Sequence, residues 1–243
     1  MQINPIGIIQ TCFTEKFGVP RQSMMVNHAW GVIKLDSAYA HPDTVLHLEE
    51  FSHLWIVYLF HKNQNPNHPE KWTNTIQPPR IDAPKKVGVF ASRSPHRPNP
   101  IGLSVVKLEK INRVGSLVEI EVSGVDILDG SPVLDIKPYV PYADSLPDAT
   151  SGWIKNEITR YSVMFSEQAE KMILGSSLQH QNLKKLIFEI LEWDPRPRSQ
   201  REQSPIESEL SVGKKFAFRL MDYDIHWVIG QSATLMVQEI KRL

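Results

Sequence analysis

The segment of the chain with the clearest chemical potential is Ala-Ser-Arg-Ser-Pro-His-Arg-Pro-Asn-Pro-Ile-Gly-Leu-Ser at residues 91–104. Its three prolines fix φ and remove backbone donors, so we expect a stiff loop rather than a helix or a central strand. Such a loop presents Arg93, Arg97 and Asn99 at low entropic cost, which suits recognition of a carboxylate, a phosphate or a polar heterocycle. A proline-stiffened connection with solvated arginines is the alternative that composition leaves open.

Two further polar segments adjoin apolar ones. Residues 17–22, Phe-Gly-Val-Pro-Arg-Gln, are typical of a turn and carry an arginine and an amide side chain. Residues 61–63, His-Lys-Asn, follow directly after the apolar and aromatic run 53–60. That run has the length of a strand buried on both faces. The polar groups after it are therefore expected at a strand end, where binding residues are common.

Residues 126–139 combine a turn signal with an unusual density of charge. Asp129 and Gly130 predict a hairpin turn between two strands. Asp135 and Lys137 alternate along the following strand, so both side chains should share one face of it, next to Asp129. A plain hairpin is the usual interpretation of such a pattern, but it does not need this charge cluster.

Several common kinds of site are missing from the sequence. No two of the twelve glycines are one residue apart, which excludes the dinucleotide fingerprint and the usual Gly-rich methyl-donor loop of doubly wound folds. A phosphate-binding P-loop, a Gly-x-Ser-x-Gly elbow and a His-Glu-x-x-His motif are also absent. None of the nine histidines pairs with a carboxylate at ligand spacing, so no metal site is expected.

Composition indicates an ordinary globular protein of 243 residues, 41% hydrophobic and 22% charged, with room for one large domain or two modest ones. No run is long enough to span a membrane, and the N-terminus lacks a signal-peptide pattern, so we expect a cytoplasmic location. Cys12 is the only cysteine, which excludes an internal disulfide. It is expected to be a small, partly buried apolar residue.

The net charge of zero conceals an uneven distribution. Residues 80–113 contain eight Lys or Arg against two acidic residues, whereas residues 114–151 contain seven Asp or Glu against one Lys. A basic face able to meet phosphates is therefore compatible with the neutral total. The alternative is that neighbouring strands pair opposite charges across a sheet.

Apolar patterning predicts about seven strands in the first part of the chain with no long amphipathic helix between them. This pattern favours an antiparallel barrel or sandwich over βαβ units. A bulge is expected at Gly31. The predicted strands are 3–11, 25–35, 53–60, 86–91, 103–111, 117–125 and 133–139.

The character of the sequence changes near residue 164 and predicts a small α+β domain. A helix is expected over 167–174, capped by Ser166 and stopped by Gly175. The spacing of apolar residues predicts an amphipathic helix over 178–193. A Ser/Glu/Gln-rich link over 199–211 then precedes strands at 215–221, 225–229 and 234–240, with a hairpin turn at 222–224. The predicted fold is thus mainly β, with an N-terminal barrel domain at 1–160 and a smaller α+β domain at 165–243.

The polar segments also carry a resemblance to a known family, the TsaA/TrmO family of tRNA N6-threonylcarbamoyladenosine methyltransferases. The matching motifs are long and specific, and they extend over most of the first 145 residues. They are Pro20-Arg21-Gln22, the region 48–61, the loop 91–104 and Asp-Gly-Ser-Pro-Val-Leu-Asp-Ile-Lys-Pro-Tyr at 129–139, while Asp-Pro-Arg-Pro at 194–197 and the segment 223–227 resemble the C-terminal domain of bacterial members.

This resemblance implies a homodimeric β-barrel methyltransferase that uses S-adenosylmethionine. It implies methylation of N6 of N6-threonylcarbamoyladenosine at position 37, in the anticodon loop of a threonine tRNA. Arg93 is expected to clamp the methionine carboxylate and Asp129 to accept hydrogen bonds from the ribose. The backbones of Leu103 and Leu128 are expected to meet the adenine. The donor-binding residues carried over by motif are Pro20, Arg21, Gln22, His61, Lys62, Arg93, Leu103, Ile127, Leu128, Asp129 and Gly130.

The acceptor side needs fewer groups because a sulfonium is already activated and in-line positioning supplies much of the acceleration. A carbamoyl group withdraws the N6 lone pair, so a base or a polarising group would assist, and Asp135, Lys137 and Tyr139 are the candidates. Arg97 or Lys137 would hold the threonyl carboxylate. Phosphate contacts are expected from Lys85, Lys86, Lys184, Lys185, Arg196, Arg198 and Arg201, although Lys184 and Lys185 fit a solvated helix face equally well.

Two other classes of function remain open from the sequence. A non-catalytic RNA-binding module would bind tRNA without any response to S-adenosylmethionine. A peptide-partner protein is the second, because Pro95-x-x-Pro98 beside Arg93 resembles an SH3-type ligand. That second interpretation requires a free-standing loop.

Overall fold

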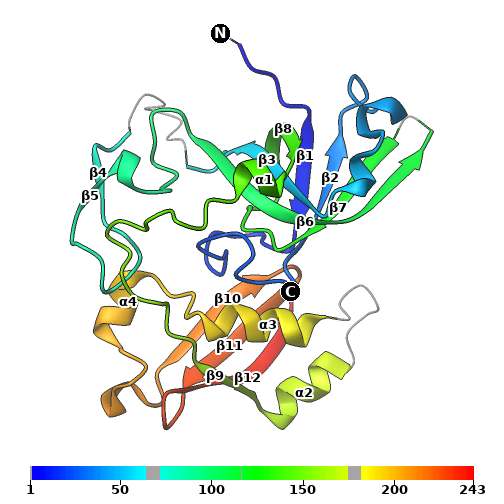
Figure 1. Cartoon of the computed structure of the whole chain (residues 1–243). Coiled ribbons are helices and arrows are strands. Elements are labelled where there is room, and N and C mark those ends of the chain that lie inside the picture. The colour runs from blue at the N-terminus through cyan, green and yellow to red at the C-terminus, as the bar shows by residue number, and fades with distance from the viewer. Residues whose placement is uncertain (1, 64–71, 116, 175–181) are drawn as a thin grey trace.

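The computed structural model describes residues 2–63, 72–115, 117–174 and 182–243. Figure 1 shows a barrel in the upper part of the molecule and a sheet with helices below it. Within the described residues, no helix is both long enough and apolar enough to cross a membrane.

The upper part is a closed antiparallel barrel of six strands, which confirms the barrel expected from the sequence (Figure 1). The strand order around it is β1-β2-β7-β6-β3-β8, and β8 closes the barrel by pairing with β1. Its strands are β1 (Gly7–Thr11), β2 (Trp30–Leu35), β3 (His53–Leu59), β6 (Ile101–Val114), β7 (Leu117–Ser123) and β8 (Ser131–Pro138).

Alternating burial explains why these segments form a barrel. Along β3, Leu54, Ile56 and Tyr58 are buried inside, whereas Trp55 and Val57 are half-buried on the outer face. The expectation that this strand is buried on both faces was therefore wrong for the outer side chains. Because successive residues of a strand point to opposite faces, the outer face of β3 is free to contribute to a site.

Two details of the predicted barrel were wrong. The pairing of Gly31 is continuous with Thr11 on one side and Val122 on the other, so β2 contains no bulge there. Asp129 and Gly130 do not form a hairpin, because β7 and β8 are not neighbours. Instead, Oδ1 of Asp129 accepts a hydrogen bond from the backbone N of Thr11 at 2.8 Å, and Gly130 adopts φ of 75°. The turn thus crosses the end of the barrel.

Short elements connect the strands. The expected strand at 86–91 is only β5 (Val87–Gly88), which pairs with β4 (Thr75–Ile76) and continues into the 3₁₀ turn η3 (Val89–Ala91). The remaining short elements are η1 (Pro42–Val45), η2 (Leu48–Glu50) and α1 (Pro141–Asp144).

The lower part is an α+β unit, as expected. Its sheet has the order β10-β11-β12-β9, with β9 parallel to β12 and the other pairs antiparallel. The elements are β9 (Ser162–Phe165), α2 (Glu167–Leu174), α3 (Leu183–Glu192), α4 (Arg198–Gln203), η5 (Glu209–Ser211), β10 (Lys215–Leu220), β11 (Tyr223–Ile229) and β12 (Thr234–Arg242). The domain boundary between 160 and 165 stays a prediction.

Local signals in the lower part were mostly correct. The Ser166 hydroxyl accepts from the backbone N of Ala169, so it caps α2 as expected. The apolar stripe of α3 is buried, whereas Gly175 and the start of the helix predicted at 178 lie outside the described residues. Two elements were not predicted from the sequence: β9, and α4, which occupies the start of the segment 199–211 that was expected to be a link. The hairpin turn lies one residue earlier, because Tyr223 already pairs with Leu220.

The segment 12–29 runs between the barrel and the lower sheet and fixes one to the other (Figure 1). The backbone N of Met221 donates to the carbonyl of Cys12 at 3.0 Å. Nε1 of Trp193 donates to the carbonyl of Met25 at 2.8 Å, and Nδ1 of His28 lies 2.7 Å from Oε1 of Glu189. The turn that carries Arg21 and Gln22 is therefore held from both sides.

Candidate functional site

A cavity of about 520 Å³ lies at the rim of the barrel, beside the end of β3 and the start of β6. It lies within the size range of small-molecule sites in proteins. Three segments that are distant in the sequence line the cavity: the turn 19–22, the strand end 60–63 and the segment 91–104, which we call the proline-rich loop. The predicted donor-binding residues that line it are Pro20, Arg21, Gln22, His61, Lys62, Arg93, Leu103 and Leu128.

Three of the predicted donor-binding residues do not line this cavity. Ile127 is fully buried in the core. Asp129 and Gly130 cross the barrel end, where one oxygen of the Asp129 carboxylate is occupied by Thr11. The role expected for Asp129 at a ribose would fall to its other oxygen and stays a prediction.

The proline-rich loop is held in place at the cavity rather than free-standing. Nη1 of Arg93 donates to Oε1 of Gln22 at 2.6 Å, which joins the loop to the 19–22 turn. Nη1 of Arg97 donates to the carbonyl of Ser92 at 2.8 Å, so Arg97 braces its own loop. Nε1 of Trp153 donates to the carbonyl of Ala91 at 2.9 Å. A loop fixed in this way does not fit an SH3-type ligand.

The cavity also contains a carboxylate that sequence reasoning missed. Asp126 lines it, and the hydroxyl of Ser104 donates to its Oδ1 at 2.6 Å. Burial raises the pKa of Asp126 above its usual value, while the hydrogen bond from Ser104 and the charge of Arg93 act in the opposite direction. The cluster 126–129 drew attention to Asp129, but only the strand topology shows which carboxylate faces the cavity.

Close packing shapes the inner end of the cavity. A Cβ at Gly102 would lie 2.3 Å from Cζ of Tyr58, so only glycine fits beside this ring.

Nδ1 of the cavity residue His61 lies 3.2 Å from the hydroxyl of Ser131. Burial, reinforced by the charge of Lys62, lowers the pKa of His61, which favours a neutral imidazole at pH 7.

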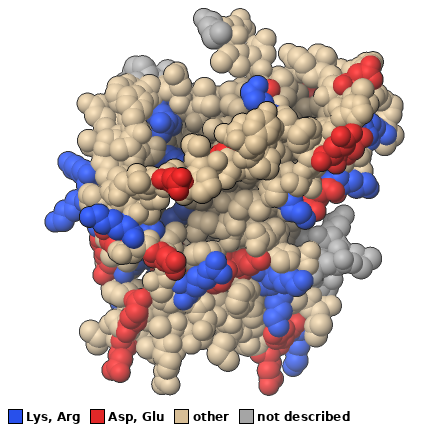
Figure 2. Space-filling model, viewed as in Figure 1, with Lys and Arg blue, Asp and Glu red and all other residues tan. Residues whose placement is uncertain are grey.

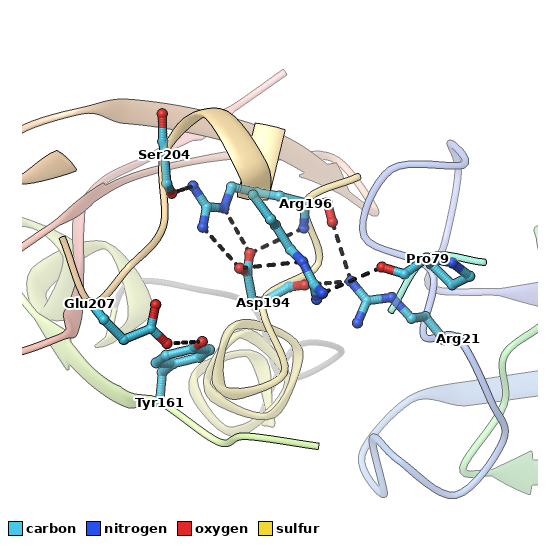
Figure 3. A network of polar contacts seen from close by, with 8 residues as sticks. Arg21, Pro79, Tyr161, Asp194, Arg196, Ser204 and Glu207 are labelled. Atoms are coloured by element: carbon cyan, nitrogen blue, oxygen red, sulfur yellow. Dashed lines mark hydrogen bonds and ion pairs between the residues drawn. The ribbon is translucent and has the colours of Figure 1, made fainter. Parts of the chain in front are cut away.

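A buried polar network joins Arg21 to the lower part of the molecule (Figure 3). Nη2 of Arg21 donates to the carbonyls of Asp194 at 2.8 Å and Arg196 at 3.2 Å. Both carbonyls belong to the loop 194–196. An ion pair between its first and last residues stabilises this loop, because Nε of Arg196 lies 2.7 Å from Oδ1 of Asp194. Burial and the charge of Arg201 lower the pKa of Arg21 to about 10, so Arg21 stays protonated at neutral pH.

This network corrects three predicted phosphate contacts. Arg196 is fully buried, with its guanidinium 4.7 Å from the ring centroid of Phe216. Arg201 is buried and donates to the carbonyl of Pro79. Arg198 donates to Glu202 and to the carbonyl of Arg80. All three arginines are therefore structural in this chain.

The predicted phosphate-binding lysines have mixed positions. Lys85, Lys86 and Lys185 are exposed. Lys184 is half-exposed, forms an ion pair with Glu170 and lies over the ring of Phe165, which fits the alternative of a solvated helix face. In the β6–β7 pairing Lys110 lies opposite Glu121, so cross-strand pairing of opposite charges explains part of the uneven charge distribution.

The predicted catalytic residues lie outside the cavity, on the outer face of β8 and just after it. Asp135 and Lys137 form an ion pair at 2.8 Å, and this pairing raises the pKa of Lys137. Lys137 is opposite Trp55 in the β3–β8 register, and the ring of Tyr139 lies 5.9 Å from that of Trp55. Because Trp55 itself lines the cavity, these three residues border it without lining it.

Two other kinds of chemistry find no support in the described part of the chain. Cys12 is fully buried, and burial raises the pKa of its thiol to about 12, so it is not a nucleophile. The described residues contain no group of three or more His, Cys, Asp or Glu able to hold a metal ion.

The structure thus defines a closed antiparallel β-barrel protein with a cavity for a small molecule at its rim. Models of both domains of one family match the chain: the tRNA-methyltransferase O N-terminal domain over residues 8–145 and the TrmO C-terminal domain over residues 158–243. The chain belongs to the tRNA-methyltransferase O family.

Individual relatives agree with this assignment. The chain is 37% identical over 227 residues to the tRNA (adenine(37)-N6)-methyltransferase of Escherichia coli K12, covering 93% of this chain and 92% of that protein. It is 40% identical to a putative S-adenosylmethionine-dependent methyltransferase of Pseudomonas aeruginosa, with 93% and 91% covered. The crystal structure of TrmO from Pseudomonas aeruginosa matches with a TM-score of 0.76 at 35% identity, covering 99% of this chain and 98% of that one.

Proposed function

We propose that this protein transfers the methyl group of S-adenosylmethionine to N6 of adenosine 37 in tRNA, with the threonylcarbamoyl form in threonine tRNA as acceptor. The observation that carries this proposal is the convergence of three sequence segments, each expected to bind the donor, on one cavity of about 520 Å³. Relatives named as tRNA (adenine(37)-N6)-methyltransferases support the choice of acceptor. The protein acts in the cytoplasm, where its tRNA substrate is found, and as a homodimer.

The residues of the cavity fit this donor chemically. Arg93 and Gln22 together offer hydrogen-bonding groups for an amino-acid carboxylate. Leu103 and Leu128 supply apolar contacts for a base, and Asp126 supplies a negative charge that attracts a sulfonium. When bound, S-adenosylmethionine supplies an activated methyl group to a nucleophile.

The acceptor side is assigned to the outer face of β8. Asp135 and Lys137 border the cavity across Trp55, so an adenine that enters over Trp55 would meet both charges. Asp135 takes the proton that N6 loses, and protonated Lys137 binds the threonyl carboxylate. Tyr139 packs against Trp55 and positions it. The residues therefore orient the acceptor and remove one proton, while most of the acceleration comes from positioning.

Mass spectrometry of tRNA nucleosides tests this function. A strain that lacks the protein should lose the N6-methylated form of threonylcarbamoyladenosine and accumulate the unmethylated nucleoside. Incubating tRNA from that strain with the purified protein and S-adenosylmethionine should restore the methylated form.

The melting temperature of the protein should rise with both S-adenosylmethionine and S-adenosylhomocysteine. Binding of tRNA with no response to either compound would instead identify a non-catalytic RNA-binding module.

Asp126→Asn should weaken binding of S-adenosylmethionine more than binding of S-adenosylhomocysteine. The reason is that only the sulfonium of the former is attracted by the carboxylate, since the product contains a neutral thioether. We expect a selective loss of about 5- to 10-fold, which corresponds to about 1 kcal/mol between partly buried charges. In the unsubstituted protein this preference should decline as the pH falls and Asp126 becomes protonated, and the raised pKa brings that change to a higher pH than for an ordinary carboxyl.

Isothermal titration calorimetry with both compounds measures this effect across pH. Asp148→Asn is the matched control, because this exposed carboxylate does not line the cavity. Equal losses for both compounds in Asp126→Asn would contradict the electrostatic role.

A further inference from the structure

One surface beside the cavity extends beyond the donor site. It consists of Trp72, Lys85, Lys86, Phe90 and Arg97, and we refer to it as the aromatic–basic surface. Phe90 is 75% exposed and Trp72 is 43% exposed. Their rings are stacked with centroids 6.4 Å apart, and the guanidinium of Arg97 lies 5.9 Å from the Phe90 centroid. Single exposed hydrophobic residues are ordinary, but two stacked rings with a cation beside them form an organised binding surface.

The backbone holds Phe90 outward in a fixed position. Phe90 lies in η3, where the backbone N of Val89 donates to the carbonyl of Asn74 at 3.0 Å. The Ser92 hydroxyl donates to the carbonyl of Val89 at 2.7 Å, and Trp153 donates to the carbonyl of Ala91. Because hydrogen bonds fix the turn on both sides of Phe90, its ring contacts a partner without the entropic cost of ordering a loop.

The charge around these rings suits a polyanion. Residues 83–100 contain four Lys or Arg and no Asp or Glu. Lys85 and Lys86 are exposed, and Figure 2 shows basic side chains grouped over the edge of the molecule that holds β4 and β5 in Figure 1. Exposed aromatic rings next to cations are typical of surfaces that bind single-stranded nucleic acid, where bases stack on the rings and phosphates contact the cations.

The aromatic–basic surface is continuous with the cavity. Arg97 lines the cavity and also lies beside Phe90, so one side chain belongs to both. A nucleotide adjacent to one whose base enters the cavity would therefore reach Phe90. We propose that the aromatic–basic surface binds the anticodon loop by stacking an unpaired base, next to the methylated nucleotide, on the ring of Phe90. This inference rests on the proposed function, since it requires an RNA acceptor.

Fluorescence anisotropy with a labelled anticodon stem-loop RNA tests the inference. Phe90→Ala should weaken RNA binding by about 5- to 100-fold, the range expected for loss of one base–aromatic stack. The salt dependence should keep its slope, because no cation is lost, whereas the double variant Lys85→Ala, Lys86→Ala should reduce the slope. Phe90→Trp should bind about as well as the unsubstituted protein. Phe188→Ala, which removes a 40% exposed phenylalanine from α3, is the matched control and should bind normally.

Calorimetry with S-adenosylhomocysteine separates this inference from the proposed function. Phe90→Ala should retain the affinity of the unsubstituted protein for this compound, which shows that the cavity is intact. If the unsubstituted protein binds neither the compound nor the RNA, the proposed function fails. If it binds both and Phe90→Ala binds RNA equally well, the stacking inference alone is wrong. Phe90→Ala could instead dissociate into protomers in sedimentation analysis while its RNA affinity per protomer stays unchanged. That result would assign the aromatic–basic surface to contact with a second copy of the chain and would also overturn the stacking inference.

Discussion

Arg93→Ala should weaken binding of S-adenosylmethionine by about 10- to 100-fold. Hydrogen bonds to a charged group contribute about 1.5–3 kcal/mol, and Arg93 lines the cavity with its guanidinium placed by Gln22 at 2.6 Å. S-adenosylhomocysteine has the same carboxylate, so its affinity should fall by a similar factor. Isothermal titration calorimetry with both compounds provides the measurement.

Two variants sharpen this prediction. Arg93→Lys keeps the charge but loses the planar fork, so it should restore only part of the affinity. Arg242→Ala removes an exposed arginine that pairs with Asp222, and since neither residue lines the cavity, this variant should bind both compounds normally. Unchanged affinity in Arg93→Ala would show that the methionine carboxylate is bound elsewhere.

Asp194→Ala should lower the stability of the folded protein by about 3–5 kcal/mol. The carboxylate binds Arg196 through two hydrogen bonds of 2.7 and 2.9 Å, and Arg196 is fully buried. Removing the Asp194 carboxylate leaves the buried guanidinium of Arg196 without its partner, which is far more costly than losing an exposed ion pair. In a chain of this size the melting temperature should fall by about 10 °C.

The same substitution should also weaken donor binding in the folded state. Arg21 donates to the carbonyl of Asp194, so a disordered 194–196 loop would release a residue of the cavity. Thermal unfolding and donor titration well below the transition measure the two effects. Glu239→Ala, which removes a carboxylate from an exposed pair with Lys241, is the control and should cost less than about 1 kcal/mol. An equal melting temperature for the two variants would contradict the role of this ion pair.

The strands of the barrel could be predicted because the alternation of buried and exposed residues within a strand depends only on nearby residues in the sequence. This alternation could not predict strand partners, since pairing depends on contacts between distant segments. Asp129–Gly130 illustrates the difference: the dipeptide correctly predicts a turn, but the following strand pairs with β1 and β3 instead of returning along β7. The parallel strand β9 was missed because it is short and only half-buried.

The site shows the same division between local and distant information. Residue types in the proline-rich loop and in the 19–22 turn predicted binding groups, and the fold brings both to one cavity. Arg196 looked like a phosphate ligand because an arginine between prolines is usually exposed. Its burial depends on Phe216 and Trp227, which lie on strands further along the chain. Asp126 was overlooked because sequence does not show which of several nearby carboxylates faces inward.

The most direct test of the central claim is a crystal structure of the protein with S-adenosylhomocysteine and an anticodon stem-loop. The compound should occupy the cavity at the barrel rim, with its carboxylate within hydrogen-bonding distance of Arg93 and its sulfur facing the base of nucleotide 37. A compound bound away from the proline-rich loop, or a base 37 far from Trp55, would contradict the account.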